Sequence, residues 1–259
     1  MSSIENSIQL SLCITTKDRF ETFLGNHLRK YVAMLRDDVI QEIVVSDENG
    51  EDARRIRDDP ILSLELGSML ALTHRFRIYT NTSVLGVARN KMQVCQYAKP
   101  GHFVVLMDSD NFADEQYFQC VRAYIRKHQI RTTDEAVLCP VHCRPFFNFG
   151  SHAGQVYDRK RIREESVDAF LNVGNYVMTE AVAKYIPAAD ADLPWTEVGA
   201  VDVIYTHILR LRQLPGYRIH VVPDLVYDHC VHGGSEYLST QFYMDHLMEM
   251  RIRPKLKML

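Results

Sequence analysis

Residues 103–111, FVVLMDSDN, combine an apolar run with two carboxylates at its end. Five consecutive apolar residues that include two valines predict a strand buried on both faces. Because side chains alternate along an extended chain, Asp108 and Asp110 point the same way if the strand continues through Ser109. Open α/β sheets bind ligands beyond the carboxyl ends of their strands, and paired carboxylates there suit a divalent cation that carries phosphates. The alternative is a plain turn, in which Asp, Ser and Asn are common.

Three further strand candidates precede this stretch, and helical patterns separate them. The candidates are residues 8–14, 40–46 and 76–79. Helical periodicity follows the first at 23–35 and the third at 88–97, whereas the segment after the second combines one helix and an irregular connection broken at Pro60. Strands that alternate with helices predict an α/β fold with a doubly wound, mostly parallel central sheet and helices on both faces.

Polar side chains follow the first two strands. Thr15, Thr16 and Arg19 come after the first strand, where they can bind a nucleotide together with helix amides or can simply cap the helix. Asp47 begins a six-residue polar run after the second strand. It can accept a hydrogen bond from a nucleotide base, or it can belong to a solvated loop.

The helix that follows the third strand has a basic first turn, with Arg89 and Lys91. Cations at a helix N-terminus oppose the helix dipole. We therefore expect an anion close to these two side chains.

Four segments resemble the motifs of family 2-like, GT-A fold glycosyltransferases in order and spacing. They are CITTKDR at 13–19, IVVSDENGED at 43–52, NTSVLGVARNKM at 81–92 and FVVLMDSDN at 103–111. The resemblance implies a Rossmann-like GT-A fold. It also implies the transfer of a sugar from a nucleotide diphosphate donor, a UDP-sugar above all, to a hydroxyl of a glycan or other acceptor.

The resemblance implies roles for the nucleotide half. In the family, positions that match Thr15, Thr16 and Arg19 line the nucleotide cleft, the position that matches Asp47 contacts the base, and the one that matches Arg89 lies near the donor. The sequence departs from the family at Thr15-Thr16-Lys17, where Pro-Thr-aromatic is commoner.

Asp108-Ser109-Asp110 resembles the family's acidic triplet, which contacts the nucleotide sugar and binds Mn²⁺ or Mg²⁺ through its carboxylates. A Gly-rich loop after the strand predicted at 217–222 contains two histidines. A neutral imidazole can complete a metal site begun by two carboxylates, and in relatives a histidine of this stretch does so. We expect His229 to be this third ligand, with His232 as the alternative.

Residues 194–202, PWTEVGAVD, precede a clear helical pattern. Asp202 can be a first-turn acid of that helix. In the family an Asp at this position is the base that deprotonates the acceptor hydroxyl, which implies an inverting reaction. Glu197 is the alternative base, and we expect Trp195 and Glu197 to contact the acceptor. The segment around Asn175 resembles the one that lies beneath the donor sugar.

Length and composition favour one compact unit. The 259 residues are 46% hydrophobic and 24% charged, with a net charge of -3, so charge gives no argument for a nucleic-acid partner. We expect a single GT-A domain over 1–259, with a nucleotide-sugar half at 1–115, an acceptor-binding half at 116–235 and a helical tail at 236–259.

Six cysteines with no leader in front of them predict free thiols in the cytoplasm. The cationic, methionine-rich tail packs on the sheet or contacts a membrane surface.

Two other functions remain open from the sequence. A sugar-phosphate nucleotidylyltransferase needs a glycine-rich, basic phosphate loop after the first strand, and residues 15–19 contain no glycine. A non-catalytic nucleotide-sugar or glycan-binding module is suggested by Val201, which replaces the first acid of the family's acidic pair. A metal-dependent hexosyl- or pentosyltransferase is the leading hypothesis.

Overall fold

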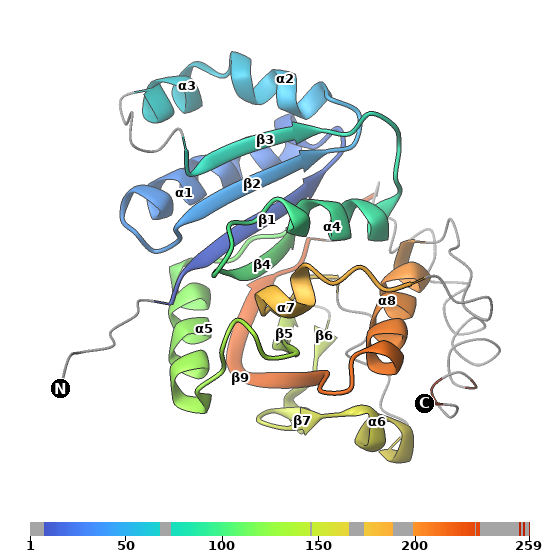
Figure 1. Cartoon of the computed structure of the whole chain (residues 1–259). Coiled ribbons are helices and arrows are strands. Elements are labelled where there is room, and N and C mark those ends of the chain that lie inside the picture. The colour runs from blue at the N-terminus through green and yellow to red at the C-terminus, as the bar shows by residue number, and fades with distance from the viewer. Residues whose placement is uncertain are drawn as a thin grey trace.

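The structure is a computed structural model of the chain, and it describes residues 8–67, 74–145, 147–165, 174–188, 199–230, 232–233, 254, 256 and 259. Within these residues the strands join in one sheet (Figure 1). The strands are β1 (Leu10–Thr16), β2 (Glu42–Asp47), β3 (Phe76–Thr80), β4 (Phe103–Asp108), β5 (Ala136–Arg144), β6 (Phe147–Asn148), β7 (Val156–Tyr157), β8 (Val177–Met178) and β9 (Arg218–Asp228).

Helices connect most of these strands. They are α1 (Gly25–Arg36), which continues a π-helical turn η1 (Phe20–Leu24), then α2 (Glu51–Asp58), α3 (Pro60–Gly67), α4 (Val87–Gln96), α5 (Glu115–His128), a short 3₁₀ turn η3 (Gly150–His152), α6 (Arg159–Glu165), α7 (Glu180–Ala183) and α8 (Gly199–Gln213).

The sheet has the order β3-β2-β1-β4-β8-β5-β9-β7, and β6 pairs with β5. Strands β1 to β4 are mutually parallel, β8 runs antiparallel between β4 and β5, and β9 is parallel to β5. Both β1 and β2 are buried along their whole length, as expected for central strands that are covered on two faces. The predicted α/β fold with a mostly parallel sheet is therefore confirmed.

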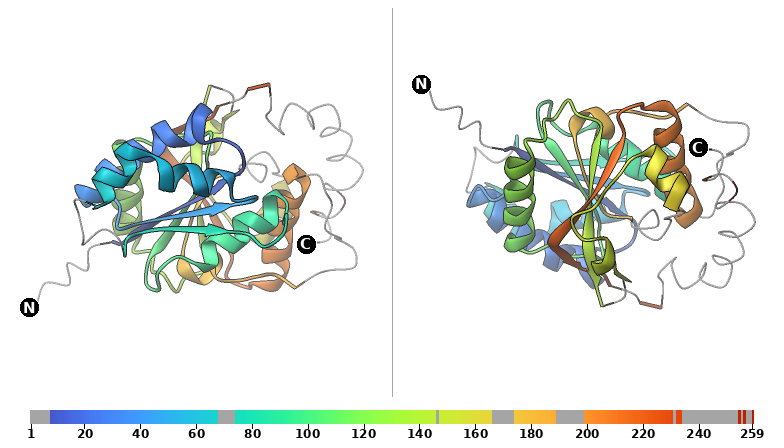
Figure 2. Two further views of the ribbon diagram at one scale, coloured as in Figure 1. Left: turned by 90° about the horizontal axis from the view of Figure 1, so that it is seen from above. Right: turned by 90° about the horizontal axis from the view of Figure 1, so that it is seen from below.

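Helices cover both faces of the sheet (Figures 1 and 2). Helices α1, α2, α3 and α5 lie on one face, where Tyr31 of α1 meets Phe118 of α5 edge-to-face at 6.4 Å. Helices α4, α7 and α8 lie on the other face, and α4 packs directly against α8. The amphipathic pattern of α1 explains its packing, because Leu28, Tyr31, Val32 and Leu35 recur at helical spacing and are all buried.

The segment around Pro60 differs from the prediction. It contains two helices in place of one helix and an irregular connection. The Asp59 carboxylate accepts hydrogen bonds from the backbone N–H groups of Ile61 and Leu62, at 3.0 and 2.8 Å, and so caps the second helix. Pro60 stands at the first helical position, where its missing N–H costs no intrahelical bond.

Helix α5 is missing from the sequence prediction, although its signal is local. The Asp114 carboxylate accepts a hydrogen bond from the N–H of Tyr117 at 3.0 Å and caps the helix. Its buried side chains follow a helical period; they are Tyr117, Phe118, Val121, Tyr124 and Ile125.

The six cysteines are free thiols, as predicted. Across the described residues, no helix combines the length and the apolar character needed to cross a bilayer. Of the tail predicted at 236–259, the structure describes only residues 254, 256 and 259. Its contact with a membrane therefore stays a prediction, as do the cytoplasmic setting and the division at 115 and 235.

Candidate functional site

The carboxyl ends of the parallel strands form one polar edge. In the register of the sheet, Thr15 of β1 lies opposite Asp108 of β4, and Thr16 lies opposite Asp47 of β2. Asp47 in turn lies opposite Thr80 of β3. Residues predicted from three separate segments of the sequence therefore meet at this edge, where α/β sheets bind their ligands.

Asp108 is held by a cation from α4. The ammonium of Lys91 lies 2.6 Å from Asp108 Oδ1 and 2.7 Å from Oδ2, and it also donates to the carbonyl of Gly174 at 2.8 Å. The hydroxyl of Thr15 donates to Asp108 Oδ1 at 3.2 Å. The Lys91 side chain is only 8% exposed, against 29% for Asp108. Asp108 is thus an anion close to Lys91, and the anion that we expected close to both Arg89 and Lys91 stays a prediction.

The backbone of Asp108 is fixed by a second set of contacts. Its N–H donates to the side-chain oxygen of Asn175 at 2.6 Å, and the amide nitrogen of Asn175 donates to the hydroxyl of Tyr227 at 3.1 Å. Asn175 and Tyr227 are both buried. Asn175 thus ties the end of β4 to β9. Sequence reasoning missed Tyr227, because nothing local marks it as a partner.

Asp110 pairs with a histidine. Nε2 of His232 lies 3.1 Å from Asp110 Oδ2. Burial and the charge of Asp108 raise the pKa of Asp110, and the contact with His232 opposes that rise. Ser109 is buried between the two acids, and its carbonyl oxygen lies 3.2 Å from Nδ1 of His27.

His229, our first choice as a metal ligand, lies just after β9. Its ring packs edge-to-face on Phe147 and Tyr227, with centroids at 5.4 and 6.0 Å. Burial lowers the pKa of His229, although the charge of Asp108 raises it. A lowered pKa favours the neutral imidazole, which is the form that binds metals. Its role as a ligand stays a prediction.

The residues of the edge fit a divalent cation in chemistry, since carboxylates and hydroxyls are hard oxygen ligands. In the described residues, however, no three His, Cys, Asp or Glu side chains form a group that could hold a metal ion. The ammonium of Lys91 contacts both carboxylate oxygens of Asp108, and Nε2 of His232 contacts one carboxylate oxygen of Asp110. Asp108 would therefore have to exchange Lys91 for the cation.

The loop after β1 is organised by Asp52, which sequence reasoning passed over as one acid in a polar run. Its carboxylate accepts hydrogen bonds from the hydroxyl of Thr16 at 2.5 Å, from the N–H of Arg19 at 3.0 Å and from the N–H of Phe20 at 2.9 Å. Asp52 is almost fully buried. The predicted nucleotide residues Thr16 and Arg19 are thus held in place by the first turn of α2.

Two acids at the end of β2 stabilise the neighbouring loops. Asp47 is fully buried, and its oxygens accept hydrogen bonds from the N–H groups of Asn49 and Ala53 at 3.3 and 2.8 Å. Burial raises the pKa of Asp47. Glu48 accepts from the N–H groups of Leu85 and Gly86 at 2.5 and 2.8 Å. In this arrangement Asp47 stabilises its own loop, and its contact with a base stays a prediction.

The remaining predicted residues are less well placed. Arg89 is exposed on the first turn of α4 and Arg19 is half-buried. Asp202 belongs to the first turns of α8. Trp195 and Glu197 lie outside the described residues, so their predicted contact with an acceptor has no structural counterpart here.

No protein-family model matches the sequence, and no curated protein is significantly similar to it. Solved structures share its fold at low sequence identity. Residues 1–349 of TarS from S. aureus are similar with a TM-score of 0.56 and 15% identity, over 96% of this chain and 69% of that chain. The same protein in complex with UDP-GlcNAc is similar with a TM-score of 0.57 and 14% identity, over 96% of this chain and 70% of that chain. A mycobacterial protein is similar with a TM-score of 0.54 and 16% identity, over 93% of this chain and 74% of that chain. The predicted GT-A-like fold is confirmed.

Proposed function

We propose that this protein is a glycosyltransferase that takes its sugar from a nucleotide diphosphate donor. The observation that carries the proposal is the polar edge at the carboxyl ends of β1, β2 and β4, where Thr15, Lys91 and Asp108 converge. This edge lies on a fold shared with TarS, which has been crystallised with UDP and with UDP-GlcNAc. UDP-sugars are therefore the donors to test first.

The donor diphosphate would bind beside Asp108. A diphosphate needs cationic partners, and Lys91 on α4 pairs with this carboxylate, with Arg89 on the same helix turn and Arg19 after β1. Asp108 and Asp110 would hold Mn²⁺ or Mg²⁺, with His229 or His232 as the third ligand. Such a cation would supply Lewis-acid stabilisation of the leaving diphosphate.

The acceptor hydroxyl would be deprotonated by Asp202 on α8, and in-line attack would invert the anomeric carbon. Trp195 and Glu197 would contact the acceptor. Replacing Asp202 by Asn should leave donor binding unchanged and lower turnover by about 100-fold or more, because it removes the general base. The Glu197→Gln variant is the matched control. If only this control loses turnover, the base is Glu197.

Calorimetry with UDP and UDP-GlcNAc, with and without Mn²⁺, tests donor binding directly. Release of UDP from the donor, measured with and without EDTA, tests transfer and its dependence on metal. A donor present at 100 times its dissociation constant should raise the free energy of unfolding by about 2.7 kcal/mol. Binding with no release in the presence of acceptors would instead indicate a non-catalytic binding module. No binding of UDP or UDP-GlcNAc would contradict the proposal.

A further inference from the structure

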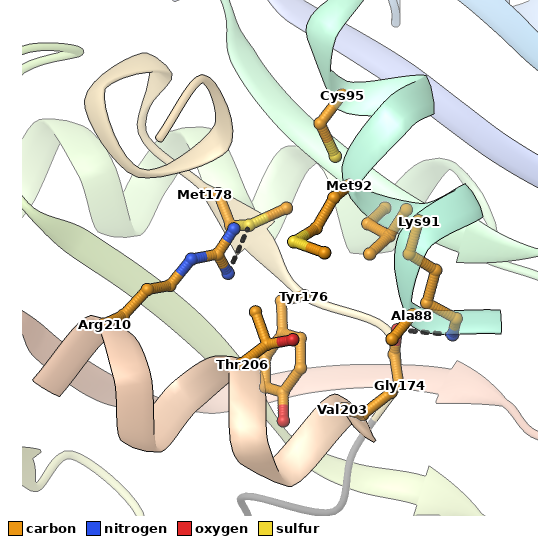
Figure 3. Close-up of a pocket in the computed structure, with 11 residues that line it drawn as sticks. Ala88, Lys91, Met92, Cys95, Gly174, Tyr176, Met178, Val203, Thr206 and Arg210 are labelled. Carbon is orange, nitrogen blue, oxygen red and sulfur yellow. Dashed lines mark hydrogen bonds between the residues drawn. The ribbon is translucent and has the colours of Figure 1, made fainter. Parts of the chain in front are cut away.

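A small cavity lies between α4, β8 and α8, on the face of the sheet opposite α1 (Figure 3). Its volume is about 30 Å³, and most of its wall is apolar. Lys91 and Gly174 line one end, beside Asp108, and Arg210 from the last turn of α8 lines another part of the wall. The cavity thus adjoins the proposed diphosphate-binding edge.

Arg210 is the unusual member of this wall. The residue is only 4% exposed. Figure 3 shows its guanidinium directed toward Met178, whose sulfur lies 3.6 Å from Nη1. The guanidinium also contacts the hydroxyl of Tyr217. The Nε atom is buried and has no hydrogen-bond partner. No ion pair joins Arg210 to a carboxylate in the part of the chain that the structure describes.

The titratable groups whose pKa is affected by the charge of Arg210 are neutral near pH 7. Burial lowers the pKa of His207 to about 3 and raises that of Cys95 to about 11. It also raises the pKa of Tyr176 and of Tyr217. Arg210 acts on each of these four groups, and none of them carries a negative charge that could balance the guanidinium.

A guanidinium stays protonated at any pH that a protein tolerates, so burial cannot discharge it. A buried charge without a counter-charge is strongly destabilising. The bonding capacity of a guanidinium is met best by an oxyanion, which can accept two parallel hydrogen bonds. A cavity beside such a group is therefore a place for an anion.

The volume limits the size of that anion. About 30 Å³ corresponds to the space of one or two water molecules. A carboxylate group or a halide ion fits this space, whereas a sugar ring does not. The ring of a donor sugar would have to stay outside, toward Gly174 and Asp108.

We infer that Arg210 binds a small monovalent anion in this cavity, and that its physiological source is the carboxylate of an acidic donor sugar, a nucleotide-linked uronic acid. The identity of the donor rests on the proposed function, whereas the anion site itself does not. Free chloride could supply the same negative charge at Arg210, and the experiment below distinguishes it from the uronate carboxylate.

The test compares UDP-glucuronate with UDP-glucose, which differ at C6 by a carboxylate in place of a hydroxymethyl group. Calorimetry of the wild-type protein should show about tenfold or tighter binding of the uronate, the scale of a charge-assisted hydrogen-bond pair. The Arg210→Met variant should lose this preference and still bind UDP as the wild type does. The Arg212→Met variant, two residues further on the same helix, is the matched control and should keep the preference.

A second arm measures thermal stability in sodium chloride against sodium isethionate at equal ionic strength. A higher melting temperature in chloride that is seen in the wild type and absent in Arg210→Met would confirm the anion site. If the wild type then binds the two donors with equal affinity, the uronic acid is overturned as the source of the anion. Equal affinities with no chloride effect would overturn the whole inference. If Arg210→Met does not fold, this wild-type result alone would still overturn the inference. Failure of UDP itself to bind would count against the proposed function, and the chloride arm would still test Arg210.

Discussion

Lys91 and Arg210 are two nearly buried cations on the wall of one cavity, and they differ in what surrounds them. Lys91 comes from the first turns of α4. Its ammonium contacts the Asp108 carboxylate and the Gly174 carbonyl, and the hydroxyl of Thr15 donates to the same carboxylate. Arg210 comes from the last turn of α8, and among the described residues its guanidinium has neutral neighbours, Met178 and Tyr217, and no carboxylate. One end of the cavity is therefore electrically balanced and the other is not.

The difference separates a buried cation that has a carboxylate partner from one that has none among the described residues. Removing one partner of a buried pair leaves the other charge without compensation, and this costs more than the pair contributes. A lone buried charge has already incurred that cost, so its removal should be harmless or favourable in the absence of a ligand. Substitutions at the two ends should then change stability in opposite directions.

The largest effect is expected from Asp108→Asn. The substitution leaves Lys91, only 8% exposed, without its carboxylate, and should lower the free energy of unfolding by about 3 kcal/mol in metal-free buffer. Urea denaturation measures this loss. The Lys91→Met variant is the matched control: Asp108 is 29% exposed and can be solvated, so the loss should be about 1 kcal/mol. Equal losses in the two variants would show that the ammonium is not effectively buried.

The second effect concerns His207, which lies beside Arg210. Its Nδ1 is 2.7 Å from the hydroxyl of Tyr217, and burial, then the charge of Arg210, lower its pKa to about 3 from the ordinary 6.5. The unfolded chain therefore takes up a proton first as the pH falls. This contribution to stability is complete above about pH 6.5 and is lost as the pH falls toward 3, with about 2 kcal/mol lost near pH 5.

Urea denaturation at several pH values tests this loss. His207→Gln should flatten the dependence between about pH 6.5 and pH 5. Arg210→Met should keep most of it, because burial is the larger cause of the lowered pKa. A slope in His207→Gln equal to that of the wild type would assign the acid sensitivity to other groups.

The fold could be predicted because its signals are local. The apolar runs of β1, β2 and β4 and the acids at their ends lie within a few residues of one another, and parallel strands bring such ends to one edge. Helix α5 shows that local signals can be overlooked, since Asp114 and the periodic apolar residues after it were available in the sequence.

The site could be predicted only in part, because its pairings depend on tertiary packing. The sequence indicated that Lys91 needs an anion, but the choice of Asp108 depends on how α4 lies across the sheet. Asp52 contacts Arg19, which is 33 residues away in the sequence, and Tyr227 contacts Asn175, which is 52 residues away. The lack of a carboxylate beside Arg210, in the part of the chain that the structure describes, depends on tertiary packing, so no motif could reveal it.

The third effect is a gain in stability. In buffer that lacks small anions, Arg210→Met should raise the free energy of unfolding by about 1 kcal/mol, because a buried charge is replaced by an apolar side chain of similar length. Added chloride should stabilise the wild type and reduce the difference. Denaturation in sodium isethionate and in sodium chloride measures both values. A loss of stability in both buffers would mean that contacts with Met178 and Tyr217 outweigh the cost of the charge.

The smallest effect should come from Gly174→Ala, at the balanced end of the cavity. A Cβ at this position would lie 2.6 Å from the Lys91 ammonium and 3.3 Å from Asp108 Oδ2, so the ammonium must move. Because it is the end of a flexible side chain, we expect a loss of only about 0.5–1 kcal/mol. In Gly174→Ala combined with Lys91→Met the clash is gone, and the added methyl should cost nothing further. A full additional loss in that double variant would mean that the methyl disturbs Asp108 or the backbone directly, and the ammonium would then not be what requires glycine at position 174.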